Sequence, residues 1–211
     1  MPELVTRHKS HGPHLQFTDS ILFITWRLAF TLPKFVMQLF NEIRSNKEDK
    51  EEQLTELKHS NNYIFAKFWE YDEALGNLPQ LGFSLNDAQI AELLRNTIHY
   101  YDGKMYDLYA FCIMSNHVHL VVRALKKEDG TFYRVDQIVQ SIKKYSSKQI
   151  NEYLGRSGQI WDNFYFDRII RDEENFDNVI NYVLNNPVKA GLVDSAAKWR
   201  DSYQCVGWYN E

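Results

Sequence analysis

One short stretch, SNHVHLVV at residues 115–122, constrains this chain more than any other part of it. Its apolar and β-branched residues follow a turn-like Ser-Asn pair and predict a β-strand. Because side chains alternate across a strand, His117 and His119 should point to one face, and Val118 and Leu120 to the other. The two imidazoles would then lie about 6–7 Å apart along the strand, close enough to share one metal ion if a third ligand comes from elsewhere.

These histidines allow two interpretations. In the first, one of them is a hydrogen-bonded core residue and the other is exposed to solvent. In the second, both bind a metal ion through their imidazoles. A lone histidine would favour the first interpretation, whereas His-x-His inside an apolar strand favours metal binding.

Composition limits the classes of protein to consider. A chain of 211 residues is most simply one domain with a substantial core. Its formal net charge of −4 argues against a protein that coats nucleic acid non-specifically, since that binding depends on neutralised phosphates. There is no run of about 18 apolar residues and no signal-peptide pattern, so we expect a cytoplasmic protein.

Hydrophobic periodicity and turn residues predict the order of strands and helices. Strands are expected at 21–26, 108–114, 115–122 and 167–170. Helices are expected to begin at Pro33, near 61, near 86, near 135 and after an N-cap at Asp172, and the last helix to end at Pro187 and Gly191.

Without a helical insertion at about 45–99, this order is β-α-β-β-α-β followed by a terminal helix. It predicts an α+β fold class, with a ferredoxin-like antiparallel sheet, helices on one face and a C-terminal helix that carries Tyr182. We expect a flexible N-terminal arm over residues 1–17 and a single domain over 18–211.

The terminal helix carries a second group of candidate residues. Its core stripe runs from Phe176 to Val183, and Tyr182 lies at the edge of that stripe. Asn186 follows four residues later and therefore shares a helix face with Tyr182. On spacing alone, such a tyrosine can be a half-buried packing residue or a catalytic one.

Two stretches together resemble a known family. MSNHVHLVV at 114–122 and NYVLNNPVKAGLV at 181–193 resemble the single-tyrosine HUH transposases, in particular the branch of REP-associated tyrosine transposases. Further segments between residues 20 and 205 fit in the same order, except for the insertion at 45–75. Ser115 departs from the family pattern, which usually has proline before the asparagine.

This resemblance implies a metal-dependent single-stranded DNA endonuclease and strand transferase that acts through a covalent 5′-phosphotyrosine, on hairpin-forming repeat DNA. It implies that Tyr182 is the nucleophile, that His117 and His119 bind the metal, and that Asn186 is the third ligand. The cofactor would be a divalent ion, Mg²⁺ or Mn²⁺. The partner would be single-stranded or hairpin DNA and not a membrane, and the protein would be a nucleoid-associated monomer or homodimer.

Basic residues offer possible contacts to DNA phosphates. Those that could line a phosphate groove are Lys143, Lys144, Lys148, Arg168, Arg171 and Lys189. The alternative is that they belong to an ordinary solvated surface.

Two other functions compete with the transposase interpretation. One is a domesticated hairpin-DNA-binding protein without significant catalysis, against which the complete set of His117, His119, Tyr182 and Asn186 argues. The other is a zinc hydrolase, which would need a third histidine or carboxylate ligand and a general base. No motif in the sequence supplies these.

Overall fold

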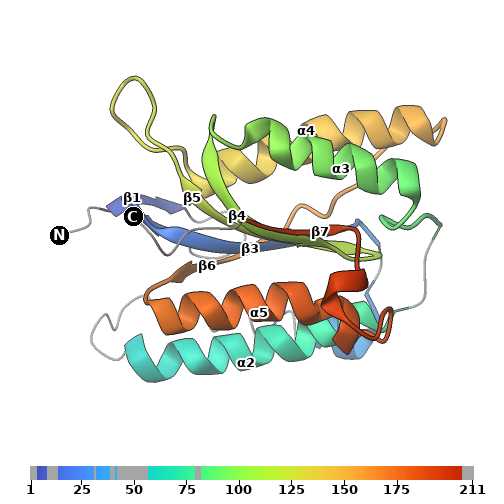
Figure 1. The fold of residues 1–211 in the computed structure, drawn as a ribbon, viewed down its shortest axis with the longest axis horizontal. Helices are drawn as coiled ribbons and strands as arrows, with labels where there is room; N and C mark the ends of the chain where they lie inside the picture. The colour runs from blue at the N-terminus through green and yellow to red at the C-terminus, as the bar shows by residue number, and fades with distance from the viewer. Residues whose placement is uncertain are drawn as a thin grey trace.

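The computed structural model describes residues 4–8, 14–30, 32–38, 41, 57–78 and 82–205. Its centre is a five-stranded antiparallel sheet with the strand order β6-β3-β5-β4-β7 (Figure 1). The strands are β3 (Ile21–Arg27), β4 (Tyr106–Ile113), β5 (His117–Ala124), β6 (Phe166–Ile170) and β7 (Ser202–Gln204). The α+β class and the antiparallel sheet are confirmed, and β5, which carries the two histidines, is the central strand.

Helices cover both faces of this sheet. They are α2 (Leu57–Gly76), α3 (Ala88–Tyr101), α4 (Val135–Tyr153) and α5 (Glu173–Lys189). In Figure 1, α3 and α4 lie on one side of the sheet, and α2 and α5 lie on the other. The expectation of helices on one face therefore holds only for α3 and α4. The physical reason is that the middle of the sheet is apolar on both sides, so each side needs a cover.

The helix that pairs with α4 is not the one expected. The sequence places the first core helix after Pro33, and residues 34–38 are indeed helical. However, Leu32 and Val36 pack with the core on the α2 and α5 side, and α3 packs beside α4. The amphipathic stripe of α3 is fully covered there and consists of Ile90, Ala91, Leu94, Thr97 and Ile98.

Helix α5 begins where the sequence predicts and ends later. Asp172 is its N-cap, and the carboxylate accepts a hydrogen bond of 2.8 Å from the backbone N–H of Asn175. Pro187, expected to end the helix, lies inside its last turn, where it removes only one backbone hydrogen bond. The helix continues to Lys189, and Gly191 then turns the chain with a φ of +67°.

The beginning of the chain is not a loose arm where it is described. Strands β1 (Leu4–His8) and β2 (His14–Phe17) pair as an antiparallel ribbon. The buried amide of Gln16 donates to the carbonyl of Tyr133 at 2.8 Å and accepts from the N–H of Val135 at 2.9 Å. These bonds attach the ribbon to the start of α4.

Residues 1–3, 9–13 and 42–56, which include the start of the expected insertion, lie outside the described residues. Among the helices that are described, none is both long enough and apolar enough to cross a membrane.

The attachment of α2 to the sheet can be tested at Phe68. This completely buried ring stacks on Phe166 of β6 with 4.0 Å between centroids and lies edge-on to Phe23 of β3 at 5.6 Å. We expect Phe68→Ala to lower the free energy of unfolding by about 3–5 kcal/mol, because a cavity remains. Phe35→Ala, at a ring that is 56% exposed, should change it by less than about 0.5 kcal/mol. Urea denaturation followed by circular dichroism measures both, and equal effects would contradict this packing.

Candidate active site

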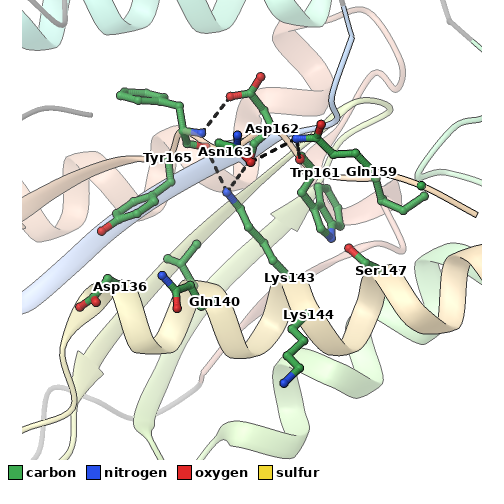
Figure 2. Close-up of a pocket in the computed structure, with 14 residues that line it drawn as sticks. Asp136, Gln140, Lys143, Lys144, Ser147, Gln159, Trp161, Asp162, Asn163 and Tyr165 are labelled. Atoms are coloured by element: carbon green, nitrogen blue, oxygen red, sulfur yellow. Dashed lines mark hydrogen bonds between the residues drawn. The ribbon is translucent and has the colours of Figure 1, made fainter. Parts of the chain in front are cut away.

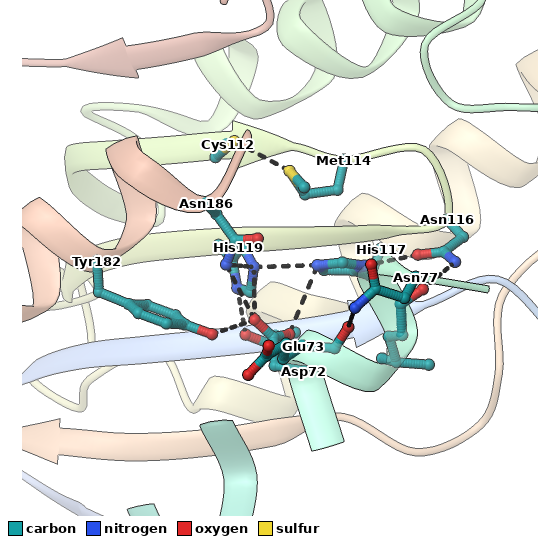
Figure 3. A network of polar contacts seen from close by, with 12 residues as sticks. Asp72, Glu73, Asn77, Cys112, Met114, Asn116, His117, His119, Tyr182 and Asn186 are labelled. Carbon is teal, nitrogen blue, oxygen red and sulfur yellow. Dashed lines mark hydrogen bonds and ion pairs between the residues drawn. The ribbon is translucent and has the colours of Figure 1, made fainter. Parts of the chain in front are cut away.

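Five polar side chains meet in the buried layer between β5 and the pair of helices α2 and α5 (Figure 3). They are His117 and His119 from β5, Asp72 from α2, and Tyr182 and Asn186 from α5. None of them is more than 6% exposed. The structure thus brings the two predicted motifs together and adds a carboxylate to them.

Asn116 fixes the orientation of His117. Its side-chain N–H donates to the carbonyl of Leu75 on α2 at 2.8 Å, so its oxygen faces the His117 ring, 2.6 Å from Nδ1. An amide oxygen only accepts hydrogen bonds, so Nδ1 of His117 carries the proton and Nε2 presents a lone pair. That Nε2 atom lies 3.5 Å from Oδ1 of Asp72.

His119 is held in a similar way by the neighbouring strand. Its Nδ1 lies 2.8 Å from the hydroxyl of Thr25, which is its direct partner on β3. Its Nε2 lies 3.1 Å from Nε2 of His117 and 3.3 Å from Oδ2 of Asp72. The expected spacing of about 6–7 Å along the strand is therefore shortened, because the two rings turn toward each other and toward the carboxylate.

This group fits a divalent metal ion. Ligand atoms of Asp72, His117 and His119 all lie within 4.8 Å of one another. Oδ1 of Asp72 is enclosed and has no hydrogen-bond partner, although it faces the lone pair of His117. A buried carboxylate oxygen next to a lone pair is unfavourable, and a cation between them would remove the conflict. Two imidazole nitrogens and one carboxylate oxygen are ordinary ligands for such an ion.

Asn186, the predicted third ligand, presents its amide nitrogen to the group. The N–H donates to Oδ2 of Asp72 at 3.0 Å, and the nitrogen lies 3.0 Å from Nε2 of His119. An amide nitrogen offers no lone pair to a metal, so Asn186 would be a ligand only with its amide turned by half a rotation. Its role as a ligand stays a prediction.

Tyr182 points inward, and its hydroxyl donates to Oδ2 of Asp72. The ring is held edge-on by Phe23, with 6.1 Å between centroids, and by His119 at 5.7 Å. Burial, reinforced by the negative charge of Asp72, raises the pKa of Tyr182 well above its usual value. Without a cation in the group, this phenol is therefore protonated at neutral pH.

The charges of the group are consistent with its geometry. Burial alone would raise the pKa of Asp72, but the two imidazoles and the Tyr182 hydrogen bond hold it well below its usual range. Burial lowers the pKa of His117 to about 4, and the nearby Asp72 offsets part of that effect. The group thus holds a carboxylate and a neutral His117 at neutral pH.

The sequence analysis missed Asp72, which belongs to the expected insertion. One signal could have found it. Phe68, Tyr71, Asp72 and Leu75 occupy successive positions on one helix face, and all four are buried. A carboxylate inside an apolar stripe needs a polar or charged partner, because acidic side chains are almost never fully buried alone.

The six basic residues of the sequence analysis do not line one groove. Lys143, Lys144 and Lys148 are on α4, across the sheet from Tyr182. Arg168 on β6 and Lys189 on α5 line a cavity of about 750 Å³ together with Tyr182. Arg171 directly follows β6 and is exposed. Their role in DNA binding stays a prediction.

Lys143 stabilises the contact between α4 and the segment before β6. Its ammonium donates to the carbonyls of Asp162 at 2.8 Å and Phe164 at 3.1 Å (Figure 2). It therefore ties α4 to the segment that precedes β6. Burial lowers the pKa of Lys143 to about 7.

The low pKa of His117 makes stability depend on pH. Its pKa is about 4 in the folded protein and about 6.5 when the ring is unperturbed. The folded state therefore binds fewer protons than the unfolded state between these values, and stability falls as the pH is lowered from about 6.5 to about 4. We expect EDTA-treated protein to show this loss in urea denaturation, and His117→Gln to show less of it. His99→Gln, at an exposed histidine, is the control, and equal pH profiles for both variants would refute the assignment.

Three comparisons connect this geometry with known proteins. Residues 84–186 match the family model described as IS200-like transposase. A putative REP-associated tyrosine transposase of Haemophilus influenzae is 24% identical over 99 residues, which are 44% of this chain and 56% of that relative. The aligned stretch therefore spans about half the length of the relative.

A solved structure of a REP-associated tyrosine transposase bound to a REP hairpin has the same fold. It matches with a TM-score of 0.51 at 14% identity, over 93% of this chain and 81% of the other. The family match contains His117, His119, Tyr182 and Asn186 but not Asp72. Together these findings confirm the resemblance indicated by the sequence motifs: the chain is similar to the IS200-like transposases over residues 84–186 and to REP-associated tyrosine transposases in part of its sequence and in its fold.

Proposed function

We propose that this protein is a divalent-metal-dependent single-stranded DNA endonuclease and strand transferase with Tyr182 as its nucleophile. The observation that carries the proposal is the convergence of the Tyr182 hydroxyl and the two imidazoles on one buried carboxylate, Asp72. The family match supports it, because it spans both the histidine strand and the tyrosine helix.

The proposed substrate is hairpin-forming repeat DNA with an unpaired segment. The support for a hairpin is the similar transposase that was solved with a REP hairpin. The net charge of −4 supports recognition of a folded DNA feature over strong binding to any DNA backbone, since the latter requires many neutralised phosphates.

In this proposal, Asp72, His117 and His119 would hold the metal ion, and Asn186 would join them if its amide turns. A bound ion would supply positive charge that stabilises the phosphate and the leaving oxygen. Tyr182 is fixed beside this position by Phe23 and His119, which restricts the motion of its hydroxyl. A nucleophile held in that way needs little further ordering before it attacks.

The chemical step is a transesterification. The Tyr182 oxygen attacks the phosphorus, the bond from phosphorus to the 3′ oxygen breaks, and a 5′-phosphotyrosine and a free 3′-OH result. As the new bond forms, the proton of Tyr182 is released to solvent and the 3′ oxygen takes up a proton from solvent, while Oδ2 of Asp72, which accepts the hydrogen bond of the phenol, orients the hydroxyl. Because the phosphodiester energy is retained in the tyrosine ester, the 3′-OH of a second strand can reverse the step and join the strands.

One observation favours a second candidate. Asp72 supplies the third ligand that a zinc hydrolase would need and that no sequence motif offered. Such an enzyme would use water as its nucleophile and would form no covalent adduct with DNA. The fate of Tyr182 variants therefore separates the two functions.

We expect Tyr182→Phe to keep the fold but to form no covalent adduct with a single-stranded hairpin oligonucleotide in Mn²⁺. The reason is that the variant lacks only the attacking oxygen. Tyr145→Phe, at a tyrosine that is 51% exposed on α4, should still form the adduct. Denaturing gels and peptide mapping of the adduct measure both, and DNA attached to Tyr145 while Tyr182 is unmodified would overturn the assignment.

Metal binding is tested by calorimetric titration with Mn²⁺. We expect the double variant His117→Ala/His119→Ala to lose binding, and Asp72→Asn to weaken it by at least about tenfold, because a charged ligand is replaced by a neutral one. Glu73→Gln changes the adjacent, exposed carboxylate of α2 and should keep the affinity. Unchanged affinity in Asp72→Asn, with circular dichroism showing an intact fold, would remove Asp72 from the ligand set.

A further inference from the structure

Two residues at the mouth of the site, Trp69 and Lys189, have no part in the chemistry described so far. Two cavities lie here, and both are lined by Trp69 of α2, Lys189 of α5 and the ring of Tyr182. The first has a volume of about 310 Å³ and reaches Asp72 and Asn186. The second has a volume of about 750 Å³ and runs along α5. We propose that Trp69 and Lys189 form a subsite for one unpaired nucleotide next to the scissile phosphate. This inference rests on the proposed function, because it places the DNA strand relative to Tyr182.

The geometry suits a base and a phosphate side by side. The half-buried Trp69 ring lies 4.2 Å from the Tyr182 ring between centroids, with 44° between the planes. The ammonium of Lys189 lies 5.1 Å from the centre of the Trp69 ring and 4.7 Å from that of Tyr182. Within the described part of the chain, Lys189 forms no ion pair, so aromatic faces hold this exposed cation beside the nucleophile.

Access to Tyr182 favours an unpaired strand. Only 6% of this residue is exposed, and its hydroxyl points away from the surface toward Asp72. The cavity of about 310 Å³ is at the small end of those that hold drug-sized ligands. It therefore suits a part of one nucleotide and excludes a duplex, so the phosphate has to enter on a strand that is free to bend.

The cavity of about 750 Å³ is lined by side chains that can form hydrogen bonds with nucleotide bases. Its lining includes four asparagines of α5, namely Asn175, Asn178, Asn181 and Asn185. Amide side chains both donate and accept hydrogen bonds, as the edges of unpaired bases require. The positive charge of Arg168 is offset in this cavity by the negative charges of Asp172 and Glu174. Stacking of a base on Trp69, rather than electrostatic attraction of the DNA backbone, therefore has to supply much of the affinity.

Trp69 lies outside residues 84–186, which match the transposase family. Helix α2, which carries Trp69, also carries Asp72. The subsite is therefore built from α2 on one side and from the tyrosine helix α5 on the other.

The test uses the full chain and a fluorescein-labelled DNA hairpin with a single-stranded flank of randomised sequence. In anisotropy titrations, we expect Trp69→Ala to weaken binding by about tenfold, within a range of about five- to 150-fold for the loss of one stacked base. Trp69→Phe should recover most of the affinity. Tyr153→Ala, at an exposed aromatic of α4 across the sheet, is the control and should bind as the unmodified protein does.

The phosphate contact is measured by salt dependence. Lys189→Gln should lower the slope of log K against log salt by about 0.7, the value for one phosphate contact on a single strand, and Lys189→Arg should retain it. Lys104→Gln, which removes an exposed cation beside Tyr100 after α3, should leave the slope unchanged.

A probe with abasic positions in the flank gives a readout that does not depend on how the variants fold. The unmodified protein should bind it about as weakly as Trp69→Ala binds the complete probe. The subsite is overturned if the abasic flank binds normally, or if neither Trp69→Ala nor Lys189→Gln changes affinity or salt slope. Mn²⁺ affinity should be the same in all these variants. Failure of adduct formation at Tyr182 would refute the proposed chemistry instead, because DNA binding does not require it.

Discussion

The site depends on one buried charge. Removing a carboxylate from water costs several kcal/mol unless neighbouring groups compensate, and Asp72 is only 1% exposed. Its hydrogen bonds come from Tyr182 and Asn186, which belong to a different helix, and its oxygens face the two imidazoles of the central strand. The docking of α2 and the alignment of the polar groups therefore require each other.

Contacts behind the histidines make this arrangement rigid. Asn116 joins the His117 ring to a carbonyl of α2, and Thr25 joins the His119 ring to β3. Both contacts act on Nδ1, so both Nε2 atoms face the interior of the site. Oδ1 of Asp72 faces the same point and has no hydrogen-bond partner, so this oxygen and the two nitrogens are placed to bind a cation.

The two faces of the sheet have different roles, one in stability and the other in the polar site. Helices α3 and α4 cover one face with an apolar core, which stabilises β5 without contributing to the polar group. Helices α2 and α5 cover the other face, where Phe23 packs against His119 and Tyr182, and Phe68 and Phe166 pack against Phe23. A strand buried on both sides gives His117 and His119 a fixed backbone, which metal binding and nucleophilic attack both need.

Local periodicity in the sequence determined part of the arrangement of the site residues. The alternation of β5 placed both histidines on one face, and the four-residue spacing of Tyr182 and Asn186 placed them together on α5, because these relations need only neighbouring residues. Tertiary packing decided the rest. The partner of Asp72 on α5 is 110 residues away along the chain, and no local pattern specifies such a contact. The same holds for α3 as the partner of α4 and for the amide of Asn186, since both are set by contacts between distant segments.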